Sequence, residues 1–429
     1  MKIFLIKLIS EKHWIKFSNN LNSYIEIADK IIDDFKKDYF MAISKATIKK
    51  NGYKLKGSLR KNGFDCWRYF FTGKNVTTGK EDCFFIELLI ENPSISPNEF
   101  ILTQKSRPKF KTEDLQAALT GNTKIRSMNA EETVVPSFVA VRAGIYGENR
   151  KQINRFYNFS EITIDKKHFN MQVNDIVFSD DTLNGSLSLT KSESVKYPEY
   201  MSQSGSIQWN LHYERVSDFP EIISKDDTSW LPGGIKTVFT GRIVIDDEEY
   251  SVTPKLCYGY SDKNWGKHFP IPFYHLASDK MTSIFSGKLM ENSCFVVQGS
   301  YESKLFVLCK FEDEVFNFSP SGKFNKYSII YNCAPVPGEE ADEQLHWTIS
   351  LTHKKYVCDI DIFCSAQMML VRDYEIPEGN HKVQKVLSGS HGIGEIRLYK
   401  KFRKNLELIQ HAKIENCISE FGTVDEKMQ

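Results

Sequence analysis

Residues 238–254 read VFTGRIVIDDEEYSVTP, and this stretch carries the clearest structural signal in the chain. Phe239, Ile243 and Ile245 alternate with smaller or more polar neighbours, which is the pattern of a strand with one buried face. An acidic turn begins at Asp246, and a second apolar alternation follows it through Tyr250. The stretch therefore predicts an antiparallel β-hairpin.

Two later stretches repeat the pattern, KLFVLCKFEDEVFNFSPSGK at 304–323 and LHWTISLTHKKYVCDIDIFC at 345–364. In the second, alternation places Cys358 and Ile360 on one face and Asp359 on the other. Strands separated by turns, without long helical spacers, are typical of antiparallel sheets that close as sandwiches or barrels. The predicted fold class is therefore mainly β, with two β-barrel or β-sandwich domains.

The length of 429 residues is long for one compact core and favours two domains. A polar run containing Pro and Gly, residues 218–234, is the candidate boundary. We expect a helical segment over 1–42, a first β-rich domain over 43–228 and a second over 229–429. The aromatic share of 13% suits strands or a cavity lined by rings.

Residues 23–42 have the pattern of an amphipathic helix. Ser23 and Glu26 have the spacing of a capping box, and apolar residues such as Ile31 and Phe35 recur at helical spacing. We expect this helix to pack on the β body through its apolar face. Contact with a membrane surface is the alternative, although the aspartates on the polar face match anionic lipid poorly.

Charge and cysteine content narrow the class of protein. The formal net charge of +1 gives no long-range attraction for nucleic acid or an anionic bilayer. Nine cysteines without a CxxC pair indicate a reduced compartment and buried thiols, with neither a zinc site nor a disulfide framework. The start of the chain lacks a signal-peptide core, and no segment approaches the roughly 20 apolar residues of a membrane span. We expect a soluble, cytoplasmic protein.

Several catalytic motifs are missing from the sequence. There is no GxSxG, GxxxxGK[ST], HExxH or GxGxxG. Ser390 and His391 are adjacent in SGSHGIGE, but neighbours on a strand point to opposite faces, so we read this stretch as a tight turn before the last strand, EIRLYKK at 395–401.

Residues 259–270 read GYSDKNWGKHFP and concentrate ionisable and aromatic side chains. The run resembles the Tyr-x-(Asp/Glu)-Lys-Asn-Trp-Gly-x-x-Phe-Pro signature of the tocopherol cyclase family, relatives of carotenoid hydratases and fungal Diels-Alderases. FDCWRYFFTG at 64–73 resembles an early family segment, and the 238–254 hairpin resembles the one that precedes the signature. The sequence departs from the family at Cys66 and Arg68, and in IPFYHL after Pro270.

The resemblance implies two lipocalin-like β domains with an apolar pocket near their junction. In the cyclases, a prenylated quinol is closed to a chromanol by protonation of an alkene, and relatives hydrate carotenoids or fold polyenes. For this chain the implied partner is a hydrophobic small molecule, such as a lipid, isoprenoid or polyene. We expect no metal and no cofactor.

Alkene protonation needs a neutral carboxyl, and Asp262 is the candidate, with a pKa raised by burial away from cations. His268 and Lys263 complete the catalytic candidates. Strand alternation should turn Lys263 away from Asp262. Aromatic and amide residues around the signature are the expected ligand-binding set: Trp67, Tyr69, Phe71, Tyr258, Tyr260, Asn264, Trp265, Phe269, Phe273 and Tyr274.

A structural interpretation of the signature stands beside the catalytic one. In it, Asp262 and Asn264 bond turn amides, Lys263 forms a surface pair, Trp265 fills the domain interface and Gly266 supplies a positive φ. Two functional hypotheses follow, an acid-catalysed cyclase, isomerase or hydratase and a non-catalytic lipocalin-like carrier, with a filled scaffold as a third. Asp262→Asn should slow the enzyme but leave the affinity of a carrier unchanged.

Overall fold

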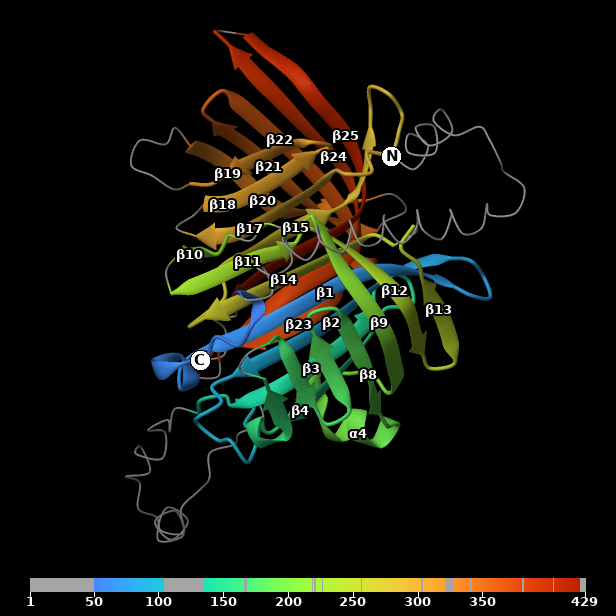
Figure 1. Cartoon of the computed structure of the whole chain (residues 1–429), viewed down its shortest axis with the longest axis vertical. Helices are drawn as coiled ribbons and strands as arrows, with labels where there is room; N and C mark the ends of the chain where they lie inside the picture. Colours follow the sequence, from blue (N-terminus) through green and yellow to red (C-terminus); the bar gives the residue numbers. More distant parts are fainter. Residues whose placement is uncertain are drawn as a thin grey trace, which may run out of the picture. The chain divides into compact units, whose positions relative to one another are not determined.

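The computed structural model consists of two curled antiparallel β-sheets, drawn in the lower and upper halves of Figure 1. It describes residues 50–103, 134–165, 168–217, 219, 221–225, 227–255, 257–301, 304–320, 327–338, 342–379, 382–403 and 405–424. The mainly β prediction is confirmed. The helix predicted over 23–42 lies outside the described residues.

The first sheet has 14 strands, in the order β10-β11-β14-β1-β13-β12-β9-β8-β7-β6-β5, with β2, β3 and β4 continuing from β1. Their bounds are β1 Phe64–Asn75, β2 Glu81–Glu91, β3 Phe138–Ile145, β4 Lys151–Tyr157, β5 Ile162–Ile164, β6 Asn170–Val173, β7 Ile176–Ser179, β8 Thr182–Leu189, β9 Gly205–Ser217, β10 Ile223–Lys225, β11 Thr228–Gly234, β12 Lys236–Ile245, β13 Glu248–Val252 and β14 Gly259–Gly266.

The second sheet has 11 strands, in the order β19-β18-β17-β15-β25-β24-β22-β21-β20, with β16 on β25 and β23 on β24. Their bounds are β15 Phe273–Ser278, β16 Lys280–Ser283, β17 Cys294–Tyr301, β18 Lys304–Phe311, β19 Glu314–Phe318, β20 Tyr327–Pro337, β21 Glu343–His353, β22 Tyr356–Ser365, β23 Leu370–Glu375, β24 Val383–Phe402 and β25 Asn405–Val424.

The change from one sheet to the other falls between Gly266 and Phe273. The predicted domain limits at 42/43 and 228/229 stay a prediction.

Helical turns are short in the described part of the chain. Their bounds are η1 Gly57–Arg60, η3 Phe159–Glu161, α4 Lys191–Lys196, η4 Pro198–Tyr200 and η6 Ala366–Met368. α4 begins with a capping box, in which Thr190 Oγ1 accepts a hydrogen bond from Glu193 N, while the Glu193 carboxylate accepts one from Thr190 N. No described helix has the length and apolarity needed to cross a membrane.

The alternation of apolar and polar residues along the strands explains how each sheet encloses a core. The predicted hairpin is present as β12 and β13, with Ile245 opposite Glu248 and a positive φ at Asp246 in the turn. On β22, Cys358, Ile360 and Ile362 are buried on one face, as predicted. All nine cysteines are free thiols, and eight of them are buried.

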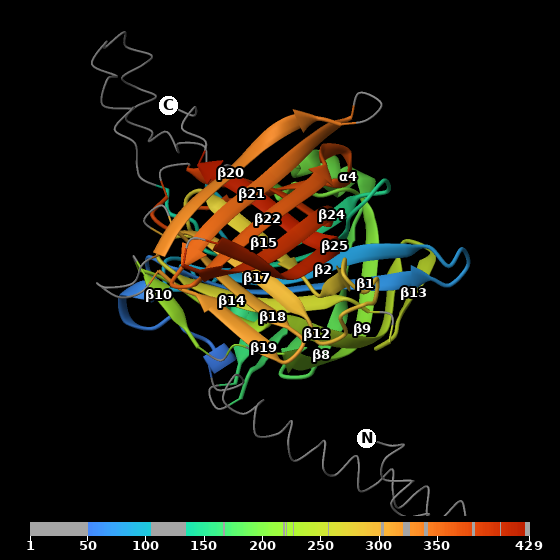
Figure 2. The ribbon, with the colours of Figure 1, turned by 90° about the horizontal axis from the view of Figure 1, so that it is seen from above.

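Each sheet curls around its own apolar core, and a third apolar layer lies between the sheets. Trp67, Tyr69 and Phe71 of β1 belong to the core of the first sheet. The third layer joins residues of both sheets, such as Phe70 and Val296. The two views show β24 and β25 of the second sheet passing close to β2 of the first (Figures 1 and 2), where β2 and β24 are in contact. Polar side chains that enter this layer are therefore enclosed from both sides.

Candidate functional site

β14 carries the signature residues and lies between β1 and β11, hydrogen-bonded to both. All eight of its residues are buried. Tyr260, Asp262 and Asn264 take part in one hydrogen-bond network, and Lys263 lies on the opposite face over the Trp67 ring. The predicted separation of Lys263 from Asp262 by strand alternation is confirmed.

Asp262 is an ionised carboxylate held by several donors. The Arg68 guanidinium donates to both of its oxygens, from Nε at 2.8 Å and from an Nη at 2.5 Å. Tyr260 OH at 2.8 Å and Trp230 Nε1 at 3.0 Å also donate to it. Burial alone would raise the pKa of Asp262, but the charge and hydrogen bonds of Arg68, together with His275 and the Tyr260 hydroxyl, lower the net pKa. The expectation that Asp262 titrates above a free aspartate, away from any cation, is wrong.

Arg68 is also part of a longer series of buried charges that joins the two sheets. It contacts Glu420 of β25 at 2.7 Å, and Glu420 lies 3.6 Å from Arg372 of β23. Arg372 returns to Glu87 of β2 at 2.5 Å, where Arg142 of β3 also binds at 3.2 Å. We call this series the inter-sheet ion chain. Its members, in order, are Asp262, Arg68, Glu420, Arg372, Glu87 and Arg142. The signs alternate along it, so each charge has an opposite neighbour.

His275 of β15 lies beside the ion chain as a neutral ring. Its side chain is fully buried, and its ring centroid is 5.3 Å from that of Tyr260. Neither ring nitrogen forms a well-aligned hydrogen bond within the described residues. Burial, and then the Arg68 charge, lower the pKa of His275 to about 4.

Lys263 forms a separate buried cluster on the first-sheet side of β14. Its Nζ lies 2.9 Å from the Asp65 carboxylate and donates to the carbonyl of Gly52 at 2.6 Å. Burial lowers the pKa of Lys263 to about 7 and raises that of Asp65 to about 6. The interpretation of Lys263 as one half of a surface pair is therefore wrong, because the pair is buried and holds the chain entering η1.

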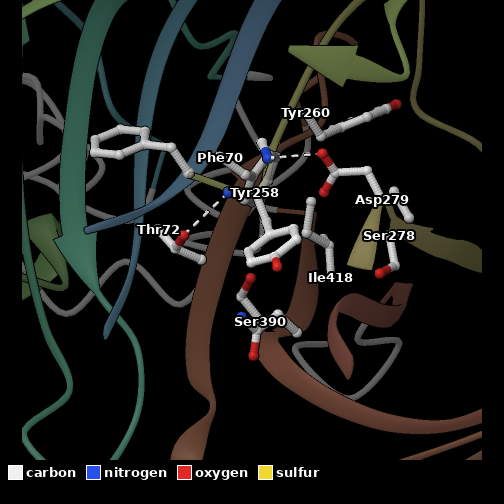
Figure 3. Close-up of a pocket in the computed structure, with 12 residues that line it drawn as sticks. Phe70, Thr72, Tyr258, Tyr260, Ser278, Asp279, Ser390 and Ile418 are labelled. Carbon is white, nitrogen blue, oxygen red and sulfur yellow. Dashed lines mark hydrogen bonds between the residues drawn. The ribbon is translucent and has the colours of Figure 1, made fainter. Parts of the chain in front are cut away.

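A recess lies beside these groups, between β1 and β14 of the first sheet and β15, β24 and β25 of the second (Figure 3). The space within it amounts to about 270 Å³ when the open solvent at its mouth is counted, and only a small part of that space is enclosed by protein. Its lining residues are Phe70, Phe71, Thr72, Tyr258, Gly259, Tyr260, Ala277, Ser278, Asp279, Ser390, Asn416 and Ile418.

Asp279 is the ionisable group of the recess. The residue is 6% exposed, and its carboxyl accepts a long hydrogen bond, 3.4 Å, from Gly259 N (Figure 3). It makes no ion pair with a described residue. Burial raises the pKa of Asp279 to about 7, against a smaller opposing effect of Lys236. A carboxyl in this state is partly protonated near neutral pH and can donate a proton.

The structure distributes the predicted ligand-binding residues over several places. Phe71, Tyr258 and Tyr260 line the recess. The others lie elsewhere: Trp67 and Tyr69 in the first core, Tyr274 in the second, Asn264 beside Asp262, Trp265 on the Lys263 side, Phe269 stacked on Phe64 with ring centroids 3.9 Å apart, and Phe273 next to Arg68. His268 is partly buried, and its carbonyl accepts a hydrogen bond from Thr228.

Sequence reasoning missed Asp279 as a site residue. The available signal was alternation, because Asp279 follows His275 and Ala277 at two-residue spacing. Among the residues that the structure describes, no three His, Cys, Asp or Glu side chains come together as metal ligands would.

Comparisons with known proteins give weak structural similarities only. No family model matches the sequence, and no curated protein matches it. Three solved structures are similar along most of the chain. A putative AttH from Nitrosomonas europaea has a TM-score of 0.43 and 7% identity, covering 87% of this chain and 95% of that one. Kievitone hydratase from Nectria haematococca has a TM-score of 0.39 and 9% identity, covering 83% of this chain and 88% of that one. CghA has a TM-score of 0.34 and 7% identity, covering 85% of this chain and 89% of that one.

Proposed function

We propose that the protein is an enzyme that isomerises, cyclises or hydrates a neutral, mainly apolar small molecule by acid catalysis in the inter-sheet recess. Asp279 is the proton donor. The observation that carries this proposal is the position of Asp279, a buried carboxyl with one long backbone hydrogen bond, in a recess with aromatic walls. The tocopherol-cyclase-like signature supports the same class of chemistry.

Asp262 is unsuited to the role that the signature suggested for it. A carboxylate that accepts two hydrogen bonds from Arg68 has no proton to give at neutral pH. We assign Asp262 a positioning role instead, because it accepts the hydrogen bond of the Tyr260 hydroxyl, and the Tyr260 ring is a wall of the recess. The signature strand then acts on the recess through Tyr260.

The proposed reaction begins when the Asp279 O–H bond breaks and its proton bonds to the substrate. The substrate becomes a cation, which the faces of Phe70 and Tyr258 can stabilise. The cation then loses a different proton, closes on an internal oxygen, or takes up water and loses a proton. In each case one proton returns to the Asp279 carboxylate. Until then, the Gly259 N–H stabilises the negative charge of that carboxylate.

The matched pair Asp279→Asn and Asp180→Asn tests this proposal. Asp180 is a half-buried carboxyl whose pKa burial raises to about 6, and it lies outside the recess residues, so it controls for the chemical change. Apolar compounds that copurify with the protein are first identified by native mass spectrometry. An apolar extract of the source cells is then incubated with each variant and followed by liquid chromatography and mass spectrometry.

We expect wild type and Asp180→Asn to convert a compound to an isomer or to a product heavier by one water, and Asp279→Asn to lose at least about a hundredfold in rate. The rate should fall as pH rises through about 7, where the donor loses its proton. Binding of a compound without conversion by wild type would favour the alternative function, a carrier. Full turnover by Asp279→Asn would refute the assignment of the acid.

A further inference from the structure

Most polar side chains of the recess are already occupied by partners in the protein. Thr72 Oγ1 accepts a hydrogen bond from Tyr258 N, and Ser278 Oγ donates to the carbonyl of Glu415. The Tyr260 hydroxyl donates to Asp262, and the Asn416 amide donates to Glu81. These groups line the recess, but their hydrogen bonds are made to other residues of the protein.

Three polar groups remain available to a ligand. The Asp279 carboxyl has the one long bond from Gly259 N described above. Within the described part of the chain, no hydrogen bond is made by the hydroxyl of Ser390 or of Tyr258, both of which line the recess. Figure 3 draws the Asp279 carboxyl and Ser390 on opposite sides of the Tyr258 ring. Each of these groups can donate a hydrogen bond when it carries its proton.

The remaining lining is apolar, and the mouth can be located by exposure. Phe70, Ala277 and Ile418 are buried, whereas Tyr258 and Asn416 are partly exposed and mark the opening. Outside it, Lys280 lies 4.8 Å from the centre of the Tyr258 ring, and Glu81 neutralises Lys280 at 3.1 Å. Among the described residues that line the recess none is a cation, and Lys236, whose charge acts on Asp279 from outside that lining, donates to the carbonyl of Glu291.

We infer that the ligand is a neutral molecule with a hydrogen-bond-accepting oxygen, such as a carbonyl, epoxide or hydroxyl, at one end of an apolar body, and that it enters oxygen first toward Asp279. This inference rests on the proposed function and narrows its substrate class. Protonation then occurs on oxygen, in place of the bare alkene that the signature implied.

The physical reason is the cost of an unsatisfied buried donor. The protonated Asp279 carboxyl must leave water, and an alkene gives its O–H no strong acceptor, whereas a carbonyl oxygen does. A carboxylate ligand would oppose the Asp279 charge above pH 7 and meets no cation among the described residues that line the recess. The predicted order of affinity is therefore ketone, then alkene, then carboxylate.

Three probes of similar shape test this order: 2-heptanone, 2-methyl-1-heptene and heptanoate. Each is titrated at pH 6 and pH 8 into the full chain, labelled with ¹³C at the aspartate side-chain carboxyls. The Asp279 resonance is assigned as the one missing from Asp279→Asn, and Asp180 provides the internal reference.

We expect 2-heptanone to shift the Asp279 resonance and leave Asp180 unchanged, with an affinity about tenfold above that of 2-methyl-1-heptene. That advantage should disappear in Asp279→Asn at pH 6 and shrink at pH 8, where Asp279 has lost its proton. Heptanoate should bind weakest, and more weakly at pH 8.

An alkene that binds as tightly as the ketone, or no shift of Asp279 with any probe, would overturn the inference. Failure of the proposed function is a separate result, because it is measured as turnover by Asp279→Asn. If turnover depends on Asp279 but the alkene probe binds more tightly than the ketone, the proposed function stands and the inference of an oxygen-first ligand is refuted.

Discussion

Replacement of Arg68 by methionine should strongly destabilise the fold, because Arg68 lies at the centre of the inter-sheet ion chain. The guanidinium makes three hydrogen bonds to the carboxylates of Asp262 and Glu420. Removal of one partner of a buried ion pair typically costs about 3–5 kcal/mol, since the other charge stays buried and uncompensated. Glu420 keeps Arg372 at 3.6 Å and Asp262 keeps the Tyr260 hydroxyl, so we expect a total within that range, below the sum of two broken pairs.

The pH dependence of this loss identifies its cause. In the wild type the folded pKa of Asp262 is lowered, so the pair contributes its full stability above the unfolded pKa of 3.8 and loses it as pH falls through the folded value. In the variant, burial without Arg68 raises the folded pKa of Asp262, so the variant loses stability as pH rises. The difference between the two proteins should therefore be larger at pH 7.5 than at pH 4.5.

Urea denaturation followed by tryptophan fluorescence measures both quantities. Arg242→Met is the matched control, because Arg242 is 61% exposed and 3.9 Å from Glu249, and its loss should cost less than about 0.5 kcal/mol. A loss below about 1 kcal/mol for Arg68→Met, or a loss independent of pH, would show that the ion chain does not hold the sheets together.

Three further substitutions test other features of the fold and site. Gly266 has φ +150°, and a Cβ there would lie 2.2 Å from the Asp227 carbonyl oxygen, so Gly266→Ala should lower the melting temperature by several degrees, while Gly52→Ala, in open space, should not. His275→Leu should match or exceed wild-type stability in urea at pH 7. It should also remove a loss of stability of up to roughly 3 kcal/mol on acidification, because the pKa of wild-type His275 is about 4 when folded and about 6.5 when unfolded. A variant less stable than wild type at pH 7 would contradict this. Asp279→Asn should be more stable than wild type at pH 8 and similar at pH 4 in calorimetry, because the raised folded pKa of Asp279 removes stability as pH rises from about 4 to 7; equal stability at pH 8 would argue against a buried Asp279.

Local patterns in the sequence were enough for many of the strands and their faces, but the turn predicted at SGSHGIGE was wrong, because β24 runs through these residues from Val383 to Phe402. The opposite directions of Asp262 and Lys263 follow from a period of two, and the turn at Asp246 follows from its acidic residues. Such patterns do not predict which distant residues pack against each face of a strand. Arg68 precedes Asp262 by 194 residues, and only the pairing of β1 with β14 brings them together.

Asp279 shows a second limit of the sequence. Next to Lys280 and after a strand, it has the pattern of an exposed turn residue. Its burial depends on β24 and β25, which come more than a hundred residues later. The pKa of a carboxyl is set by solvent access and neighbouring charge, neither of which a linear pattern contains. The proposed acid could therefore be placed near the signature but not at the correct residue, which lies between β15 and β16.

The inter-sheet ion chain also has a consequence for the timing of synthesis. Arg68 is made 352 residues before Glu420, an interval of roughly 20–70 s at about 5–20 residues per second. During that time the nascent first sheet presents Arg68 without Glu420 of β25, and Glu87 without Arg372 of β23. Although each sheet has its own apolar core, the first half can reach its native state only when the last strand docks. We therefore expect a ribosome-bound chain that ends before β23 to remain accessible to protease and to chaperones.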